Sequence, residues 1–222
     1  EKLNKEVLLV SSGALALGKK YLKLKNIALK ISEKQAAASV GQVLLINAWK
    51  EAFLKDKIKC GQILLTHLDA EIRSSSINAR NTIESLIKYK VIPIINENDT
   101  VATKELRYGD NDQLAARVAQ ISSADLLILL SDVDGLYTSN PLKNKSAKLI
   151  KRVYKISKSI EKASEDTASS TAVGGMQTKI KAAKIALASG CNMVITKGSN
   201  SYPFKSIFKN NKATWFITHT SP

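Results

Sequence analysis

Short apolar runs alternate with helix-length stretches along this chain, and this alternation constrains the fold more than any other feature. The apolar runs cover residues 7–10, 63–65, 91–95, 126–130 and 193–195. Stretches with apolar residues at three-to-four spacing cover residues 33–55, 75–90, 112–121 and 176–189. Strands separated by helices indicate βα units and a mainly parallel sheet with helices on both faces. We therefore expect one α/β domain, with residues 143–158 forming a basic, irregular excursion over its surface.

Four of these runs are followed by small or polar residues, at positions 11–14, 96–100, 131–135 and 196–198. Ligands of open α/β sheets bind outside the carboxyl ends of the strands. Ordinary turn chemistry explains any one of these loops, because Ser, Asn, Asp and Gly are common in turns everywhere. Four such loops together, one of them with four polar residues at 96–99, favour a binding site at this edge of the sheet.

Two further segments carry chemistry. Residues 109–112 precede a predicted helix, and a single N-cap explains only one of the three polar residues there. Residues 174–179 open a helix that Gly190 ends, and glycines at a helix N-terminus let backbone N–H groups approach a phosphate. Lys179, one turn into that helix, can add a point charge. The alternative is a flexible loop with Lys179 as one of several solvated lysines. No P-loop motif and no G-x-G-x-x-G after a strand occurs.

The formal net charge of +15 suggests nucleic-acid binding at first sight. The excess is almost all lysine, scattered over polar helix faces without interleaved aromatic residues as stacking platforms. Attraction of anionic substrates such as ATP is the better interpretation. A basic nucleic-acid-binding protein remains the alternative from a different class, and it would bind with a steep salt dependence.

Other features exclude several classes of protein. The longest purely apolar run, residues 126–130, is too short to span a membrane, and no signal peptide is visible. Cys60 and Cys191 are far apart, which predicts buried free thiols in a reducing cytosol. His67 and His219 are too few for a metal cluster, so we expect no metal site built from side chains.

Five segments resemble the glutamate 5-kinases, a branch of the amino-acid kinase family, in order and spacing. They are Ser-Ser-Gly-Ala at 11–14, NENDTVAT at 96–103, GDND at 109–112, SDVDGLY at 131–137 and GGMQTK at 174–179. The segment at 131–137 is shared widely among amino-acid kinases, whereas those at 96–103 and 109–112 are more selective. The resemblance implies the family's three-layer αβα sandwich. It also implies ATP-dependent phosphorylation of the γ-carboxylate of glutamate to γ-glutamyl phosphate, the first step of proline biosynthesis.

The same resemblance assigns roles to residues. Its substrate-binding positions are Ser12, Asn96, Asp99, Asp110 and Asn111. Its nucleotide-binding positions are Ser131, Asp132, Gly174, Gly175, Met176, Gln177, Thr178 and Lys179. Lys179 resembles the lysine that neutralises charge on the transferring phosphoryl group, and Asp112 the carboxylate that organises the catalytic lysines. Catalysis would be positioning and electrostatic stabilisation, with Mg²⁺ bridging the ATP phosphates and no general base.

The sequence departs from the family in three places. Residues 1–222 do not include the family's first strand with its K-x-G-[ST] loop, which supplies a second catalytic lysine, or a C-terminal PUA domain, and their glycine loop is short. We therefore expect an amino-acid kinase domain over residues 1–222 without these parts. The family also implies a cytoplasmic homodimer or homotetramer that hands its unstable product to glutamyl phosphate reductase. The alternatives are an acetylglutamate, aspartate, uridylate or carbamate kinase, or an inactive regulator with the kinase fold.

Overall fold

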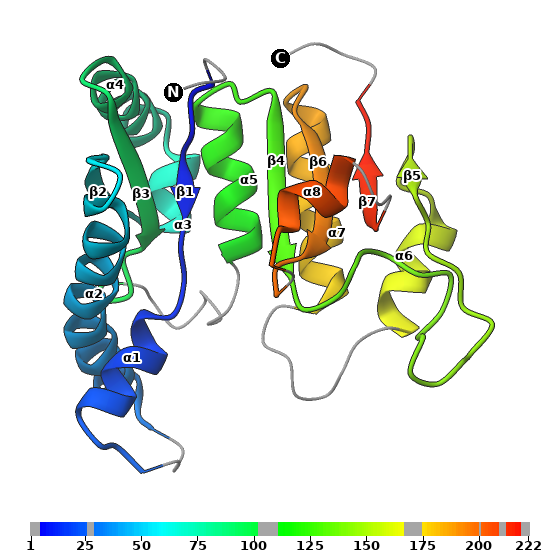
Figure 1. The fold of residues 1–222 in the computed structure, drawn as a ribbon, viewed down its shortest axis with the longest axis horizontal. Coiled ribbons are helices and arrows are strands. Elements are labelled where there is room, and N and C mark those ends of the chain that lie inside the picture. The colour runs from blue at the N-terminus through cyan, green and yellow to red at the C-terminus, as the bar shows by residue number, and fades with distance from the viewer. Residues whose placement is uncertain are drawn as a thin grey trace. The chain divides into compact units, whose positions relative to one another are not determined.

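A computed structural model describes residues 5–25, 29–101, 111–166, 175–199, 201–208 and 212–218 (Figure 1). The chain divides into two compact units, Glu1–Arg107 and Tyr108–Pro222. Each unit has its own sheet, and each places polar residues where parallel strands end.

The first unit has a three-stranded, wholly parallel sheet in the order β1-β3-β2. Its strands are β1 (Leu9–Val10), β2 (Lys59–Leu65) and β3 (Val91–Glu97), and its helices are α1 (Ala14–Tyr21), α2 (Ile31–Leu54), α3 (His67–Glu71) and α4 (Arg73–Lys88). The central strand β3 is buried from Pro93 to Glu97, and α4 packs against it. The apolar run at 91–95 therefore forms the middle of the sheet, because a strand with neighbours on both sides and a helix on its face is buried along most of its length.

Helices α1 and α2 cross at backbone contact distance. A Cβ atom on Gly18 would lie 1.7 Å from the carbonyl oxygen of Ala37, and one on Gly41 would lie 1.7 Å from that of Ala14. No side chain fits at either position, so the two glycines are required by the approach of the helices. The small residues Ala14, Gly18, Ala37 and Gly41 thereby fix how α2 lies on α1.

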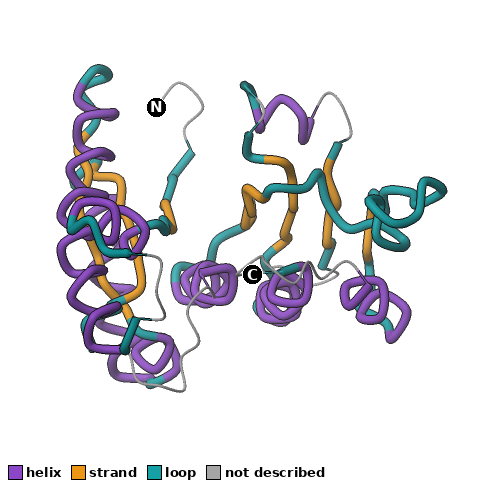
Figure 2. The backbone as a smooth tube through the Cα atoms, turned by 90° about the horizontal axis from the view of Figure 1, so that it is seen from below, coloured by secondary structure: helices purple, strands orange, loops and turns teal. Residues whose placement is uncertain are grey.

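The second unit has a four-stranded mixed sheet in the order β4-β6-β7-β5. Its strands are β4 (Leu126–Ser131), β5 (Arg152–Val153), β6 (Asn192–Lys197) and β7 (Ala213–Phe216), and its helices are α5 (Asn111–Ile121), α6 (Lys158–Asp166), α7 (Met176–Ala188) and α8 (Pro203–Phe208). Strand β4 is parallel to β6, and β5 to β7, whereas β6 and β7 are antiparallel. Figure 2 shows α5, α7 and α6 end-on in a row along one face of this sheet, with α8 on the opposite face.

Thr214 on β7 holds the loop that follows β4. Its fully buried Oγ1 accepts a hydrogen bond from the backbone N–H of Leu136 (2.8 Å) and donates one to the carbonyl oxygen of Ile150 (2.7 Å). A Cβ atom on Gly135 would lie 2.3 Å from the same Oγ1, so glycine is needed for this approach. The hydroxyl of Thr214 thus ties two segments of the loop to the sheet.

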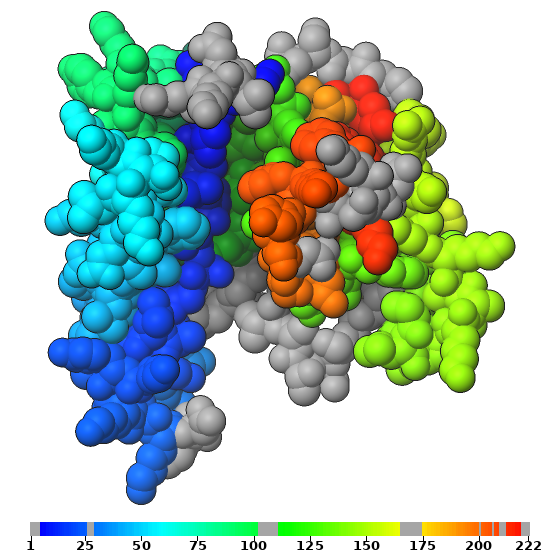
Figure 3. Space-filling model, in the orientation of Figure 1, coloured from blue at the N-terminus to red at the C-terminus, as the bar shows by residue number. Residues whose placement is uncertain are grey.

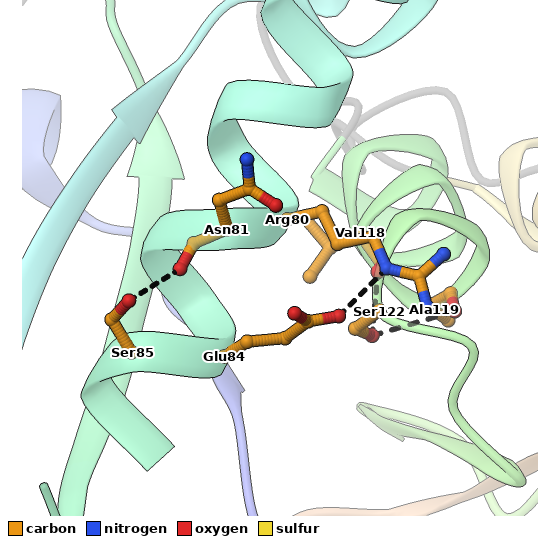
Figure 4. A network of polar contacts seen from close by, with 7 residues as sticks. All are labelled: Arg80, Asn81, Glu84, Ser85, Val118, Ala119 and Ser122. Atoms are coloured by element: carbon orange, nitrogen blue, oxygen red, sulfur yellow. Dashed lines mark hydrogen bonds and ion pairs between the residues drawn. The ribbon is translucent and has the colours of Figure 1, made fainter. Parts of the chain in front are cut away.

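Figure 4 shows local polar contacts within α4 and at the end of α5. On α4, Arg80 Nε donates to Glu84 Oε1 (2.7 Å), and Ser85 Oγ donates to the carbonyl oxygen of Asn81 (2.8 Å). At the end of α5, Ser122 Oγ donates to the carbonyl oxygen of Val118 (2.8 Å). The exposed Arg80–Glu84 ion pair contributes about 0–1 kcal/mol. Within the described part of the chain, no helix is both long and apolar enough to cross a bilayer.

The structure contains every strand and helix that the apolar pattern predicts, within a few residues of the expected bounds. The pattern did not predict α1, α3, α6, α8, β5 and β7. Residues 141–146 are exposed as expected (yellow-green at the right in Figure 3), but the predicted irregular excursion ends in β5, whose Val153 is buried against β7.

Both cysteines are free, as predicted. Cys191 is buried, and burial raises the pKa of its thiol to about 11. Cys60 is half-buried, so the prediction of a buried thiol is wrong there.

The crossing of α1 and α2 predicts the effect of Gly18→Ala. Helix propensity alone would favour alanine by about 1 kcal/mol, but the new Cβ atom overlaps the backbone of Ala37. We expect a loss of about 2–4 kcal/mol of unfolding free energy, measured by urea denaturation. The control is Ala16→Gly at an exposed position of α1, which should cost about 1 kcal/mol. A Gly18→Ala protein as stable as the parent would show that the two helices are not in backbone contact.

The buried hydroxyl of Thr214 predicts the effect of Thr214→Val. Valine keeps the shape but leaves the Leu136 N–H without its acceptor, so we expect a loss of about 1–3 kcal/mol. Thr138→Val is the matched control, because Thr138 Oγ1 also accepts a backbone N–H, that of Lys148 at 3.1 Å, but in an exposed position where water replaces it. Equal losses for the two variants would contradict the role given to Thr214.

Candidate active site

In the first unit, the predicted substrate-binding residues lie where β1 and β3 end. The register pairs Val10 with Ile95, and the Ser11 N–H donates to the carbonyl oxygen of Ile95 (2.9 Å), so Ser11 lies beside Asn96. Ser12 follows as an exposed residue, and Gly13 with φ 108° turns the chain into α1. The predicted substrate-binding residues Ser12 and Asn96 therefore belong to neighbouring strand ends.

Asn96 is the most enclosed of these side chains, with 3% of its surface exposed. Its Oδ1 accepts the backbone N–H of Glu97 (2.9 Å), and its Nδ2 donates to Gln42 Oε1 on α2 (2.7 Å). Its conformation is therefore fixed from both ends of the amide. This enclosure shows that Asn96 and Glu97 are the last residues of β3 rather than part of the turn after it.

Asp99 lies in the turn beyond β3, where the Asn98 N–H donates to the carbonyl oxygen of Leu65 (3.0 Å). Asp99 is half-buried, and this burial raises the pKa of its carboxyl above the ordinary value. A carboxylate that has lost part of its hydration gains from a cationic ligand group. Two further predicted residues, Asp110 and Gly174, lie outside the residues that the structure describes.

In the second unit, three predicted residues meet at the start of α7. Lys179 Nζ donates to Asp112 Oδ2 on α5 (3.0 Å), and Thr178 Oγ1 lies 2.9 Å from the same oxygen. Only 9% of the Lys179 side chain and 20% of the Asp112 side chain are exposed. The pair therefore presents a lysine ammonium group that is nearly enclosed and held in place by a carboxylate. Lys179 is thus not one of the solvated lysines of this helix.

The remaining predicted residues of this unit lie close to that pair in the chain or at the ends of β4 and β6. Asn111 is the first residue of α5; Gly175 is the N-cap of α7, and Met176 and Gln177 begin it, Met176 buried and Gln177 exposed. Apart from its chain neighbours, no atom of the described residues lies within 4 Å of a Cβ built on Gly175, so the space on that side of its Cα is open. At the end of β4, Ser131 Oγ donates to Asp132 Oδ1 (3.0 Å).

Of residues 196–198, which the sequence suggested as part of the site, Thr196 and Gly198 make hydrogen bonds within the second unit. Thr196 Oγ1 is buried and donates to the carbonyl oxygen of Lys212 (3.0 Å). The Gly198 N–H donates to the carbonyl oxygen of Ser131 (2.8 Å) and joins the ends of β6 and β4. Among the residues described, no group of three His, Cys, Asp or Glu side chains could hold a metal ion.

Sequence reasoning missed two residues that contact the strand ends of the first unit. Besides Gln42, Trp49 of α2 is involved, because its Nε1–H donates to Ser11 Oγ (2.9 Å). A polar side chain on the inner face of a predicted helix was the only available signal.

Curated proteins that resemble this chain include two named glutamate 5-kinase. The one from Pelagibacter ubique is 54% identical over 220 residues, which cover 99% of this chain and 60% of that protein. The one from Rhodopseudomonas palustris is 51% identical over 218 residues, 98% of this chain and 58% of that protein. The chain thus spans about 60% of the length of the curated relatives that it matches.

Solved structures show the same fold at low sequence identity. The carbamate kinase from Giardia lamblia bound to AMP-PNP matches with a TM-score of 0.62 and 16% identity, over 98% of this chain and 86% of that one. The UMP kinase from Ureaplasma parvum matches with a TM-score of 0.58 and 15% identity, over 90% and 75%. The predicted three-layer αβα fold class is thereby confirmed.

The family model described as "Amino acid kinase family" matches residues 1–197. These residues include the ends of β1, β3, β4 and β6 and the Lys179–Asp112 pair. On this match and this fold, the chain belongs to the amino acid kinase family.

Proposed function

We propose that this chain is the kinase part of a glutamate 5-kinase, which transfers the γ-phosphoryl group of ATP to the γ-carboxylate of glutamate. The nearly enclosed Lys179–Asp112 pair at the start of α7 carries this proposal, because Asp112 holds the ammonium group of Lys179 in place near the N-terminus of a helix. The identity of 54% to a protein named glutamate 5-kinase, over 99% of the chain, supports glutamate as the acceptor.

On the phosphate side, we assign Lys179 to the charge that develops on the transferring phosphoryl group. Asp112 holds the ammonium group in place, so little reorganisation is needed as the reaction proceeds. Gly175 leaves the backbone of the helix start open to phosphate oxygens. Ser131, Asp132 and residues 174–178 complete the proposed nucleotide contacts.

On the acceptor side, we assign Asp99 to the α-ammonium group of glutamate, and Ser12 and Asn111 to its carboxylates, with Asn96 and Asp110 nearby. The γ-carboxylate is ionised at neutral pH and attacks without a general base. Since no metal-binding cluster occurs among the described side chains, Mg²⁺ would enter as Mg·ATP, held chiefly by phosphate oxygens.

The proposal also includes the domain organisation, the oligomeric state and the partners that the family resemblance predicts. Residues 1–222 would act as one amino-acid kinase domain of a cytoplasmic homodimer or homotetramer, without nucleic-acid or membrane partners. The acyl phosphate product hydrolyses readily, so it would be handed to glutamyl phosphate reductase. A panel of acetylglutamate, aspartate, carbamate and UMP as acceptors separates glutamate 5-kinase from its relatives in the family.

The role of Lys179 predicts that Lys179→Ala lowers the turnover number about 10²- to 10³-fold. The assay follows ADP release from Mg·ATP by the full-length protein and traps the acyl phosphate as its hydroxamate. Lys181→Ala is the matched control, because Lys181 is an exposed lysine on the same helix and should leave turnover unchanged. Equal turnover of the Lys179→Ala variant and the parent would rule out this assignment. Absence of turnover with every acceptor would rule out the proposed function.

The burial of Asp99 predicts opposite effects of Asp99→Asn on stability and on substrate binding. Because burial raises the pKa of this carboxyl, the group stabilises the fold only at acidic pH and its charge is unfavourable at neutral pH. We expect Asp99→Asn to keep or raise the Tm at pH 7, an advantage that disappears as the pH falls through the raised pKa. The KM for glutamate should rise at least about tenfold, because the ammonium group loses its ionic partner.

Asp56→Asn, at an exposed position after α2, is the control and should change neither the Tm nor the KM. In the parent, the KM for glutamate should also rise as the pH falls towards the pKa of Asp99, and this dependence should be weaker in Asp99→Asn, where the carboxyl groups of the substrate still titrate. A lower Tm at pH 7 with an unchanged KM would contradict the role assigned to Asp99.

A further inference from the structure

Two polar side chains of α2 reach the ends of β1 and β3. Gln42 and Trp49 are seven residues apart, so they lie on one side of the helix, about 10 Å apart along its axis. Gln42 Oε1 accepts from Asn96 Nδ2 (2.7 Å), and Trp49 Nε1 donates to Ser11 Oγ (2.9 Å). One helix therefore contacts both strand ends through side chains.

The residues that Trp49 and Gln42 contact, Ser11 and Asn96, are neighbours and are buried. Ser11 and Asn96, with 7% and 3% of their surfaces exposed, directly follow the paired residues Val10 and Ile95, and the Ser11 N–H donates to the carbonyl oxygen of Ile95. Water cannot readily replace a hydrogen bond at such positions, so loss of either partner must be met by a shift of the strand end.

The helix that carries these side chains is itself fixed next to one of them. Gly41, adjacent to Gln42, is in backbone contact with Ala14, two residues after Ser12. Trp49 is in turn held by stacking on Phe53, with ring centroids 5.6 Å apart. The hydrogen bonds are thus made from a rigid support rather than from mobile side chains.

We propose that Gln42 and Trp49 are positioning residues for the acceptor amino acid, an inference that rests on the proposed function. Neither is assigned a contact with the substrate. Gln42 orients Asn96, which precedes the turn that carries Asp99, and Trp49 orients Ser11, which precedes Ser12. The contacts of Gln42 with Asn96 and of Trp49 with Ser11 and Phe53 lie within Glu1–Arg107, the unit that carries Ser12 and Asp99, so we expect their effect on the binding of the acceptor.

The test compares Gln42→Met and Trp49→Phe in the full-length protein. Gln42→Met keeps the length of the side chain and removes the amide group that binds Asn96, and Trp49→Phe keeps an aromatic ring next to Phe53, smaller than indole, and removes the Nε1–H donor. The KM for glutamate should rise roughly tenfold in each, the order of magnitude of one buried hydrogen bond, while the KM for Mg·ATP stays within about twofold. Asn47→Ala, at an exposed position of α2, should change neither value.

A merely structural role predicts a different result. A lower Tm with equal changes of both KM values, or with neither changed, would overturn the proposal.

Amide hydrogen exchange gives a readout that does not depend on the proposed function. In both variants, exchange should become faster at the strand ends, residues 11–13 and 97–99, and remain unchanged at the control amides of Gly190–Thr196. If the parent does not phosphorylate glutamate, the proposed function fails, and the exchange pattern still decides whether Gln42 and Trp49 hold the strand ends. Unchanged exchange at those residues would overturn the positioning role.

Discussion

Parallel pairing of neighbouring strands is the constraint on which the arrangement of polar residues depends. Parallel strands end at the same edge of a sheet, so whatever follows them in the sequence collects there. The register of β1 with β3 puts Ser11 beside Asn96, and the register of β4 with β6 pairs Ser131 with Lys197. The fully buried Ile95 and Ile195 hold these strands in place, because a shift by one residue would turn them out of the core.

The two ion pairs Arg80–Glu84 and Lys179–Asp112 differ in how far their side chains are exposed to water. The Arg80–Glu84 pair is about half exposed on both sides, and water screens it, so it contributes little. The Lys179–Asp112 pair is largely enclosed, and the cost of desolvating both ions offsets much of their attraction. Such a pair is poor evidence for a contribution to stability. Its consequence is a lysine ammonium group with a fixed position, which is what the proposed phosphoryl transfer would need.

The sequence predicts those parts of the fold that a local pattern determines. The apolar run at 91–95 predicts most of strand β3, and α7 lies between Gly175 and Gly190, whose φ of 81° ends the helix. The two-residue strand β5 is too short to leave a pattern, and it exists only because Val153 pairs with Phe216 far along the chain. The antiparallel pairing of β6 with β7 likewise depends on partners that no local window contains. Helix α1, with eight residues after a left-handed glycine, forms through its contact with α2.

The contacts of the candidate site are even harder to predict from the sequence, because they join residues that are far apart in the chain. Lys179 and Asp112 are 67 residues apart, and Asn96 and Gln42 are 54 apart. Strand ends and helix starts could be named in advance, since a general rule places ligands there. Gln42 could not, although it lies one turn from the buried Ala38 and Leu45 of α2. A polar residue on the inner face of a helix must have a polar partner. The periodicity of α2 therefore indicates that the amide of Gln42 has a hydrogen-bond partner. Only the fold identifies that partner as Asn96, because it brings the middle of α2 next to the end of β3.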